Sequence, residues 1–258
     1  MMNRFAILAS CALLVGSAAP AFANDDTITF GQFFQRDSAA RLFRYKNEDS
    51  VTGKGAEIYT TASTSSNAPG SIPIFFLLGT SNLPPDLSGA QSAGLSVDFI
   101  STSGTTGSGS GRIQAFGNGT ISILRDLPAN EGNNGRVNLL SVTFTNAELD
   151  ANQNSGSFTF KSNDNSVITY TSDFLDFSDV LSEDFSFSFS GASPKFNALL
   201  GSSGVNTRFS GTGTFASNPA PRTFGVPEAS TWTMLFVGFG AVGAVMRAGR
   251  RQKDLYAA

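Results

Sequence analysis

The stretch Phe185-Ser186-Phe187-Ser188-Phe189-Ser190 alternates aromatic and hydroxyl residues with a period of two. In an extended chain, successive side chains point to opposite faces of the sheet, so the three Phe rings would share one face and the three hydroxyls the other. Aromatic side chains also favour strands. The stretch therefore predicts a β-strand with one face in a core and the other face in water.

The same alternation appears elsewhere in the chain. Apolar residues repeat with period two at Leu95, Val97 and Phe99, at Ile121 and Ile123, and at Phe158 and Phe160. Further strands are expected at Thr27–Phe34, Leu42–Tyr45, Glu57–Thr61, Ile72–Leu78, Val137–Thr145, Val167–Ser172 and Thr207–Phe215. Roughly ten strands at this spacing predict an all-β body over residues 24–217, built as an antiparallel, jelly-roll-like β-sandwich.

Two segments predict breaks in this pattern. Ser101–Gly111 reads STSGTTGSGSG, a composition typical of a flexible loop. The run Thr145-Asn146-Ala147-Glu148 has the spacing of a capping box, so it predicts a short helical turn.

Composition excludes several classes of chemistry. The chain has no His, and its one Cys, Cys11, lies close to the N-terminus. A mature form without that segment has no disulfide, thiol nucleophile, His base or ordinary zinc site. Outside the two terminal segments, the body keeps 12 basic and 18 acidic residues, a net charge of −6. An acidic body is a poor match for nucleic acid, whose phosphates require clustered Lys and Arg.

The N-terminus predicts export. Arg4 precedes an apolar run from Phe5 to Val15, and Ala21-Phe22-Ala23 matches the small-residue pattern of a signal-peptide cleavage site. The apolar run is shorter than the roughly 20 residues that a membrane span needs. We therefore expect residues 1–23 to be a signal-peptide helix removed after Ala23.

A second apolar segment lies at the C-terminus, after an expected linker over residues 218–225. Its three parts are Val226-Pro227-Glu228, a short apolar helix over residues 232–246 that begins at Trp232 and is expected to span the membrane, and a basic cluster. The basic cluster contains Arg247, Arg250 and Arg251. These charges are expected to remain on the cytoplasmic side of the membrane, with the body outside. The helix glycines are small enough to allow close packing in lipid, and they are Gly238, Gly240 and Gly243.

This three-part segment, residues 226–253, resembles the PEP-CTERM sorting signal, also called the ice-binding protein C-terminal domain. The Pro-Glu motif, Trp232, the glycines and the basic cluster match, whereas Ala229 stands where a second Pro is usual and Thr233 where Ala is usual. The resemblance covers the tail only. Its alternative name does not predict ice binding, because Thr pairs such as Thr143 and Thr145 are too scattered in the sequence for a flat array.

The resemblance implies a partner and a route. The partner is exosortase, an integral-membrane enzyme that recognises such tails and cleaves near the Pro-Glu motif. The chain would be anchored transiently in the inner membrane and then reach the cell surface or the extracellular space. Proteins with this tail come from Gram-negative bacteria that also make exopolysaccharide, which implies exopolysaccharide as a second partner.

The role of the body stays open among three functions. The first is a non-enzymatic structural or interaction role in an exopolysaccharide or biofilm matrix. The second is a carbohydrate-binding or adhesive module, and the third is an extracellular hydrolase. No motif assigns catalytic roles, so we expect no enzyme and no cofactor. Asp173, Asp176 and Asp179 are weak calcium candidates, since oxygen ligands suit calcium, and a solvated acidic loop is the alternative.

Overall fold

A computed structural model describes residues 27–47, 55–80, 83, 87–106, 111–126, 137–152, 156–195, 205–223, 237 and 239. The chain divides into two compact units, residues 1–223 and 224–258. All described strands belong to the first unit. Of the second unit, only Val237 and Phe239 are described, and both are helical and exposed.

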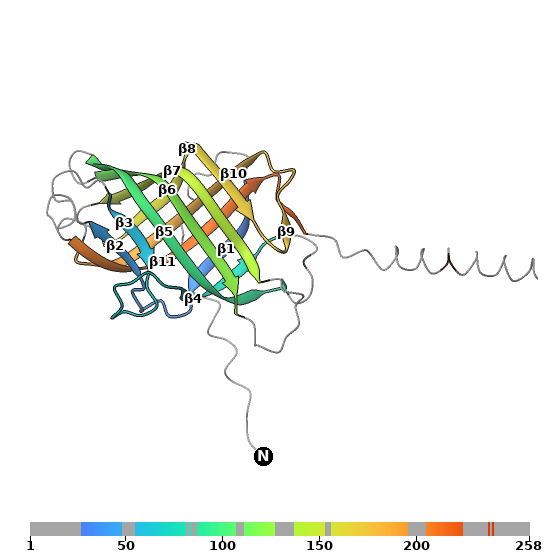
Figure 1. Ribbon diagram of the computed structural model, residues 1–258, viewed down its shortest axis with the longest axis horizontal. Helices are drawn as coiled ribbons and strands as arrows, with labels where there is room; N and C mark the ends of the chain where they lie inside the picture. The colour runs from blue at the N-terminus through green and yellow to red at the C-terminus, as the bar shows by residue number, and fades with distance from the viewer. Residues whose placement is uncertain are drawn as a thin grey trace, which may run out of the picture. The chain divides into compact units, whose positions relative to one another are not determined.

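The regular secondary structure in the described part of the first unit is almost entirely strand, which confirms the all-β prediction (Figure 1). Its strands are β1 (Ile28–Gln35), β2 (Phe43–Asn47), β3 (Glu57–Thr60), β4 (Ile72–Leu78), β5 (Ala90–Thr106), β6 (Gly111–Arg125), β7 (Asn138–Asn152), β8 (Phe158–Thr171), β9 (Leu175–Asp176), β10 (Ser182–Ser193), β11 (Val205–Asn218) and β12 (Arg222–Thr223). All described pairings are antiparallel, as expected. Strand β12, which falls in the predicted linker, pairs with β9.

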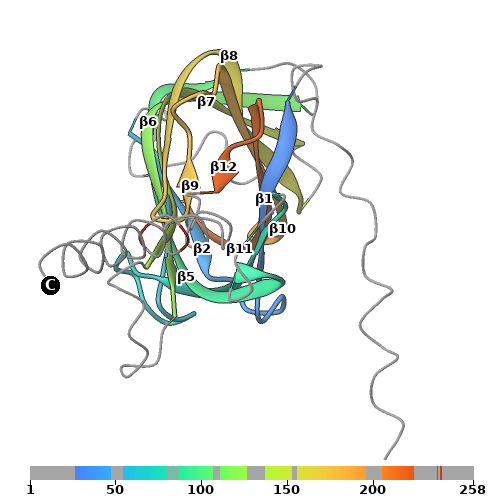
Figure 2. The same cartoon turned by 90° about the vertical axis from the view of Figure 1, so that its right-hand side faces the viewer.

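Ten of the strands form one sheet, in the order β1-β4-β5-β3-β2-β11-β10-β8-β7-β6. Additional pairings of β1 with β11 and of β5 with β6 close this sheet on itself. Figure 2 shows the result, with β6 and β7 on one side of the interior and β1 and β10 on the other. Between β11 and β5, the sheet runs through two pairs of short strands, β1–β4 and β2–β3.

The interior of the closed sheet is filled mainly by Phe rings. Phe185, Phe187 and Phe189 are 1%, 0% and 2% exposed, so the alternating stretch that predicted a buried face is confirmed. Rings from well-separated strands meet in the middle. Phe99 of β5 stacks on Phe160 of β8 with their centroids 4.5 Å apart. Because such aromatic contacts add to the gain from burial, opposite walls of the sheet are held together by this core.

Two local predictions are wrong. Residues 101–106, expected in a flexible loop, continue β5, and Thr105 and Thr106 lie opposite Gln114 and Ile113 of β6. Cross-strand pairing overrides the loop composition there. The expected helical turn at Thr145–Glu148 is instead part of β7. Asn146 has a φ of 62°, and the register with β8 shifts beside it, so the polar residues mark a β-bulge.

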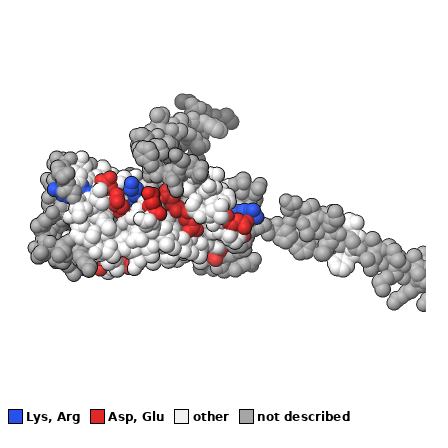
Figure 3. Space-filling model, turned by 90° about the horizontal axis from the view of Figure 1, so that it is seen from above, with Lys and Arg blue, Asp and Glu red and all other residues white. Residues whose placement is uncertain are grey.

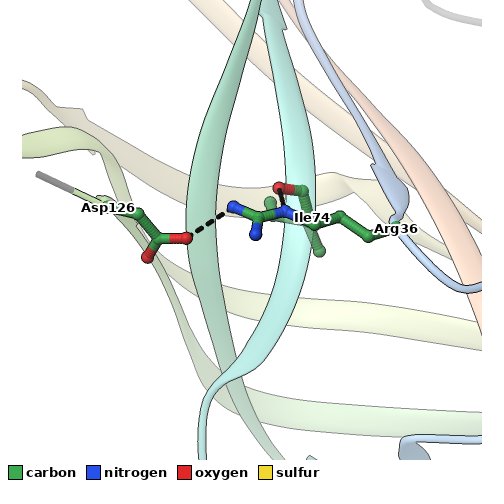
Figure 4. A network of polar contacts seen from close by, with 3 residues as sticks. All are labelled: Arg36, Ile74 and Asp126. Carbon is green, nitrogen blue, oxygen red and sulfur yellow. Dashed lines mark hydrogen bonds and ion pairs between the residues drawn. The ribbon is translucent and has the colours of Figure 1, made fainter.

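An ion pair connects the residues that directly follow β1 and β6 (Figure 4). Arg36, just after β1, lies 2.5 Å from the carboxylate of Asp126, just after β6, and its Nε donates to the carbonyl of Ile74 on β4 at 3.2 Å. The same guanidinium lies 5.4 Å from the centre of the Phe75 ring. Since both charged groups are partly exposed, the ion pair contributes about 1 kcal/mol at most.

Candidate functional site

The outer surface of β5, β6, β7 and β8 carries a groove of about 410 Å³, within the size range of ligand sites. Two rows of outward-facing side chains cross these four strands. The first row is Asp98, Thr120, Thr143 and Thr169. Each member of this row lies directly opposite the next one on the neighbouring strand. Since neighbouring strands are about 4.8 Å apart, the row is roughly 14 Å long.

The second row runs beside the first, and each of its members lies two residues away from a first-row member on the same strand. Its members are Ile100, Asn118, Thr145 and Val167. Aliphatic side chains therefore stand at both ends, with Ile100 48% and Val167 67% exposed, and polar side chains lie between them. We call the two rows together the β5–β8 groove. It offers hydroxyl, amide and carboxylate groups beside exposed methyl groups.

The sequence explains why these side chains point outward. They alternate with buried residues on the same strands, for example Asp98 between Val97 and Phe99, and Thr143 between Val142 and Phe144. Beneath the groove, buried Gly119 lets the rings of Phe99 and Phe144 approach to 5.2 Å, because a Cβ at that position would lie 2.3 Å from the Phe144 ring. A rigid aromatic layer thus supports the groove.

The site residues in the first row were not predicted from sequence. In the sequence, Thr pairs such as Thr143 and Thr145 form no regular array, yet strand pairing places Thr143 between Thr120 and Thr169. The period-two pattern identifies each outward position. It does not identify the cross-strand neighbour, which depends on the register of strands that are more than twenty residues apart.

A second polar cluster lies where β8 leaves β10. The last backbone-paired residues of β8 and β10 are Lys161 and Ser186. Beyond this pair, the two strands are connected by hydrogen bonds that involve side chains. Ser162 Oγ donates to the carboxylate of Asp184, and the Tyr170 hydroxyl donates to the Asp184 carbonyl. The backbone N–H of Tyr170 donates to Glu183 Oε1 at 3.4 Å. These contacts satisfy backbone groups that would otherwise lack a partner inside the fold.

Burial governs the titration of this second cluster. Desolvation raises the pKa of the Glu183 and Asp184 carboxyls. Desolvation, followed by the nearby charges of the same two carboxylates, raises the pKa of Tyr170 well above its usual value. Both carboxylates accept hydrogen bonds from the protein, so the arrangement is that of a structural acceptor cluster.

The three calcium candidates contact protein groups and not one another. Asp173 Oδ2 accepts the backbone N–H groups of Val137 and Asn138, both at 2.8 Å. Asp176 accepts the N–H of Ser178 at 2.9 Å, a hydrogen bond that lowers the pKa of this carboxyl. Asp179 pairs with Arg222 at 2.9 Å. Within the described ranges, no group of three or more His, Cys, Asp or Glu could hold a metal ion.

The predicted sorting and signal residues lie outside the described residues. These are Ala21, Ala23, Val226, Pro227, Glu228, Trp232, Gly238, Gly240, Gly243, Arg247, Arg250 and Arg251. Among the residues that the structure does describe, no helix has the length and apolar character to cross a membrane. Comparison with family models, curated proteins and solved structures gives no match to this chain.

Proposed function

We propose that this chain is an exported, non-enzymatic protein of the bacterial cell surface or extracellular matrix that acts by contact with matrix components. The observation that carries the proposal is the β5–β8 groove. It has several hydrogen-bonding side chains but, among its described lining residues, a single ionisable one, Asp98. Binding a matrix component needs only hydrogen-bonding side chains. A pair of catalytic groups, one acid and one base, would need a second ionisable side chain beside Asp98, with a pKa suited to proton transfer.

Export and sorting are proposed from the two terminal segments. The signal peptide, residues 1–23, would direct the chain out of the cytoplasm. The tail, residues 226–253, would hold it briefly in the inner membrane until exosortase cleaves near Pro227-Glu228. Pro227 prevents a helix from extending back through the motif and keeps the preceding residue extended, a conformation that a protease can grip.

The finer fold proposal is a flattened, jelly-roll-like sandwich whose two layers are the opposite walls of the closed sheet. Ring contacts between strands that are not neighbours support it. Phe99 of β5 stacks on Phe160 of β8 with their centroids 4.5 Å apart, and it lies 5.9 Å from Phe187 of β10. Walls that approach this closely behave like the two sheets of a sandwich.

The carbohydrate-binding alternative is favoured by the same groove, because its hydroxyl and amide groups can exchange hydrogen bonds with sugar hydroxyls. The tyrosines that the structure describes, Tyr45, Tyr59 and Tyr170, are all buried and so offer no aromatic platform for sugar stacking. The hydrolase alternative has less support. Glu183 and Asp184 are adjacent carboxylates in the second polar cluster, and both already accept hydrogen bonds from the protein.

The sorting proposal is tested by fractionating cells of a host that has exosortase. Deleting residues 226–258 should release the folded body into the periplasm, since the anchor is gone. Replacing both Pro227 and Glu228 by Ala should leave a longer, membrane-bound form. Ser230→Ala, which leaves the motif intact, is the matched control and should follow the wild type. If the deletion and the motif variant reach the same destination as the wild type, the sorting assignment is wrong.

A further inference from the structure

Five of the six polar side chains that line the β5–β8 groove make no hydrogen bond with other described residues, while Thr145 Oγ1 accepts the backbone N–H of Val167 at 3.2 Å. Among the described residues, none donates to or accepts from the side chains of Asp98, Asn118, Thr120, Thr143 or Thr169. Many other hydroxyls of the body are engaged. For example, the Ser210 hydroxyl donates to the carbonyl of Ser38 at 2.9 Å, and that of Thr61 donates to the carbonyl of Ser63 at 3.0 Å. The groove therefore gathers hydrogen-bonding capacity that remains open to a ligand.

Charge limits what that ligand can be. No Lys or Arg is among the described residues that line the groove, and Asp98 is the single charge there. The body as a whole is acidic, and Figure 3 shows acidic side chains in a band with few basic ones on the face in view. Anionic polymers and phosphate esters need Lys or Arg partners, so this surface disfavours them.

The apolar ends of the second row complete the chemical match. A sugar ring presents hydroxyl groups at its edge and C–H groups on its faces. The threonine row and Asp98 can meet the edge, while Ile100 and Val167 can cover the C–H groups. A carboxylate that accepts from two neighbouring hydroxyls forms stronger hydrogen bonds than a neutral acceptor does. At roughly 14 Å, the first row is long enough for a short run of sugar rings.

We propose that the β5–β8 groove is a binding site for an uncharged polysaccharide, laid across the four strands along the Asp98–Thr169 row. This inference rests on the proposed contact function and assigns its ligand class and its residues. Asp98 is the principal acceptor, and the three threonines supply hydroxyl donors and acceptors. Ile100 and Val167 confine the chain at the two ends of the second row.

The test is affinity electrophoresis of the full-length chain, purified in mild detergent, through native gels. The gels contain dextran, galactomannan or xyloglucan as neutral probes and alginate as an anionic probe. The wild type should be retarded by at least one neutral probe. Thr120→Val with Thr143→Val removes two hydroxyls while keeping β-branched strand residues, and binding should weaken about tenfold, the sum of two neutral hydrogen bonds. Thr143→Arg should block the groove and abolish retardation.

Thr212→Val is the matched control, because Thr212 is also exposed on a strand but lies on β11, outside the groove. It should bind like the wild type. The proposal is overturned if no neutral probe retards the wild type, if alginate retards it more strongly, or if the groove variants bind as the wild type does. These variants leave residues 226–258 intact, so a failure of binding and a failure of sorting appear in separate assays.

Discussion

Gly213 of β11 lies directly opposite Phe187 of β10, and its missing side chain makes room for two rings of the core. A Cβ at Gly213 would stand 2.3 Å from Cε1 of Phe33 and 2.4 Å from Cδ1 of Phe187. Carbon atoms pack at about 3.5–4.0 Å, so each ring would have to move by more than about 1 Å. Both rings are buried and pack against other rings of the core, Phe33 against Phe215 and Phe187 against Phe189. Gly213→Ala should therefore destabilise the fold by about 1–3 kcal/mol.

Phe187→Ala should cost more, about 3–5 kcal/mol, because it removes a fully buried ring and leaves a cavity. The two changes should not add. In the double variant, the new methyl group at position 213 enters space that the ring has vacated, so the double variant should lose less stability than the sum of the single variants, by about 1 kcal/mol or more.

The measurement is urea unfolding followed by far-UV circular dichroism. Tryptophan fluorescence is unsuitable, because the one Trp of the chain, Trp232, falls in the predicted tail, outside the described residues. Gly111→Ala is the matched control for the methyl group, since within the described residues no atom lies within 4 Å of its added Cβ. Additive losses for Gly213→Ala and Phe187→Ala would refute the steric reasoning.

Three further predictions concern titratable groups that are buried or partly buried. Because burial raises the folded-state pKa of Glu183 and Asp184, the folded state holds more protons than the unfolded state in the window just above their usual values. The free energy of unfolding should therefore fall as pH rises through that window, and Glu183→Gln should flatten the slope in urea titrations between about pH 4 and pH 7. Burial raises the pKa of Tyr45 to about 12, so an absorbance titration should show this phenol ionising only in strong alkali. Tyr45→Phe removes the 2.9 Å hydrogen bond from Tyr45 to buried Gln114 and should cost about 1–3 kcal/mol of unfolding free energy, whereas a loss near zero would show that water replaces the hydroxyl.

The alternation of apolar and polar residues along the sequence determined by itself which side chains of a strand share a buried face. Phe185, Phe187 and Phe189 were predicted to share a buried face, and they do, because the alternation of side chains is a property of any extended backbone. Ile72–Leu78 was predicted with the bounds that the structure shows. The same logic failed at residues 101–106 and at Asn146, where pairing with a neighbouring strand outweighs local propensity.

Only the tertiary structure decided which outward residues meet. Asp98 and Thr169 are far apart in the sequence, and they share a row because three successive registers align them across β5, β6, β7 and β8. Closure of the sheet likewise depends on the pairing of β1 with β11, two strands that are near the first and the last residues of the body in the sequence. Periodicity along the chain specifies the face on which a side chain lies. Its neighbours across strands depend on register and curvature, which are set by the packing of the whole core.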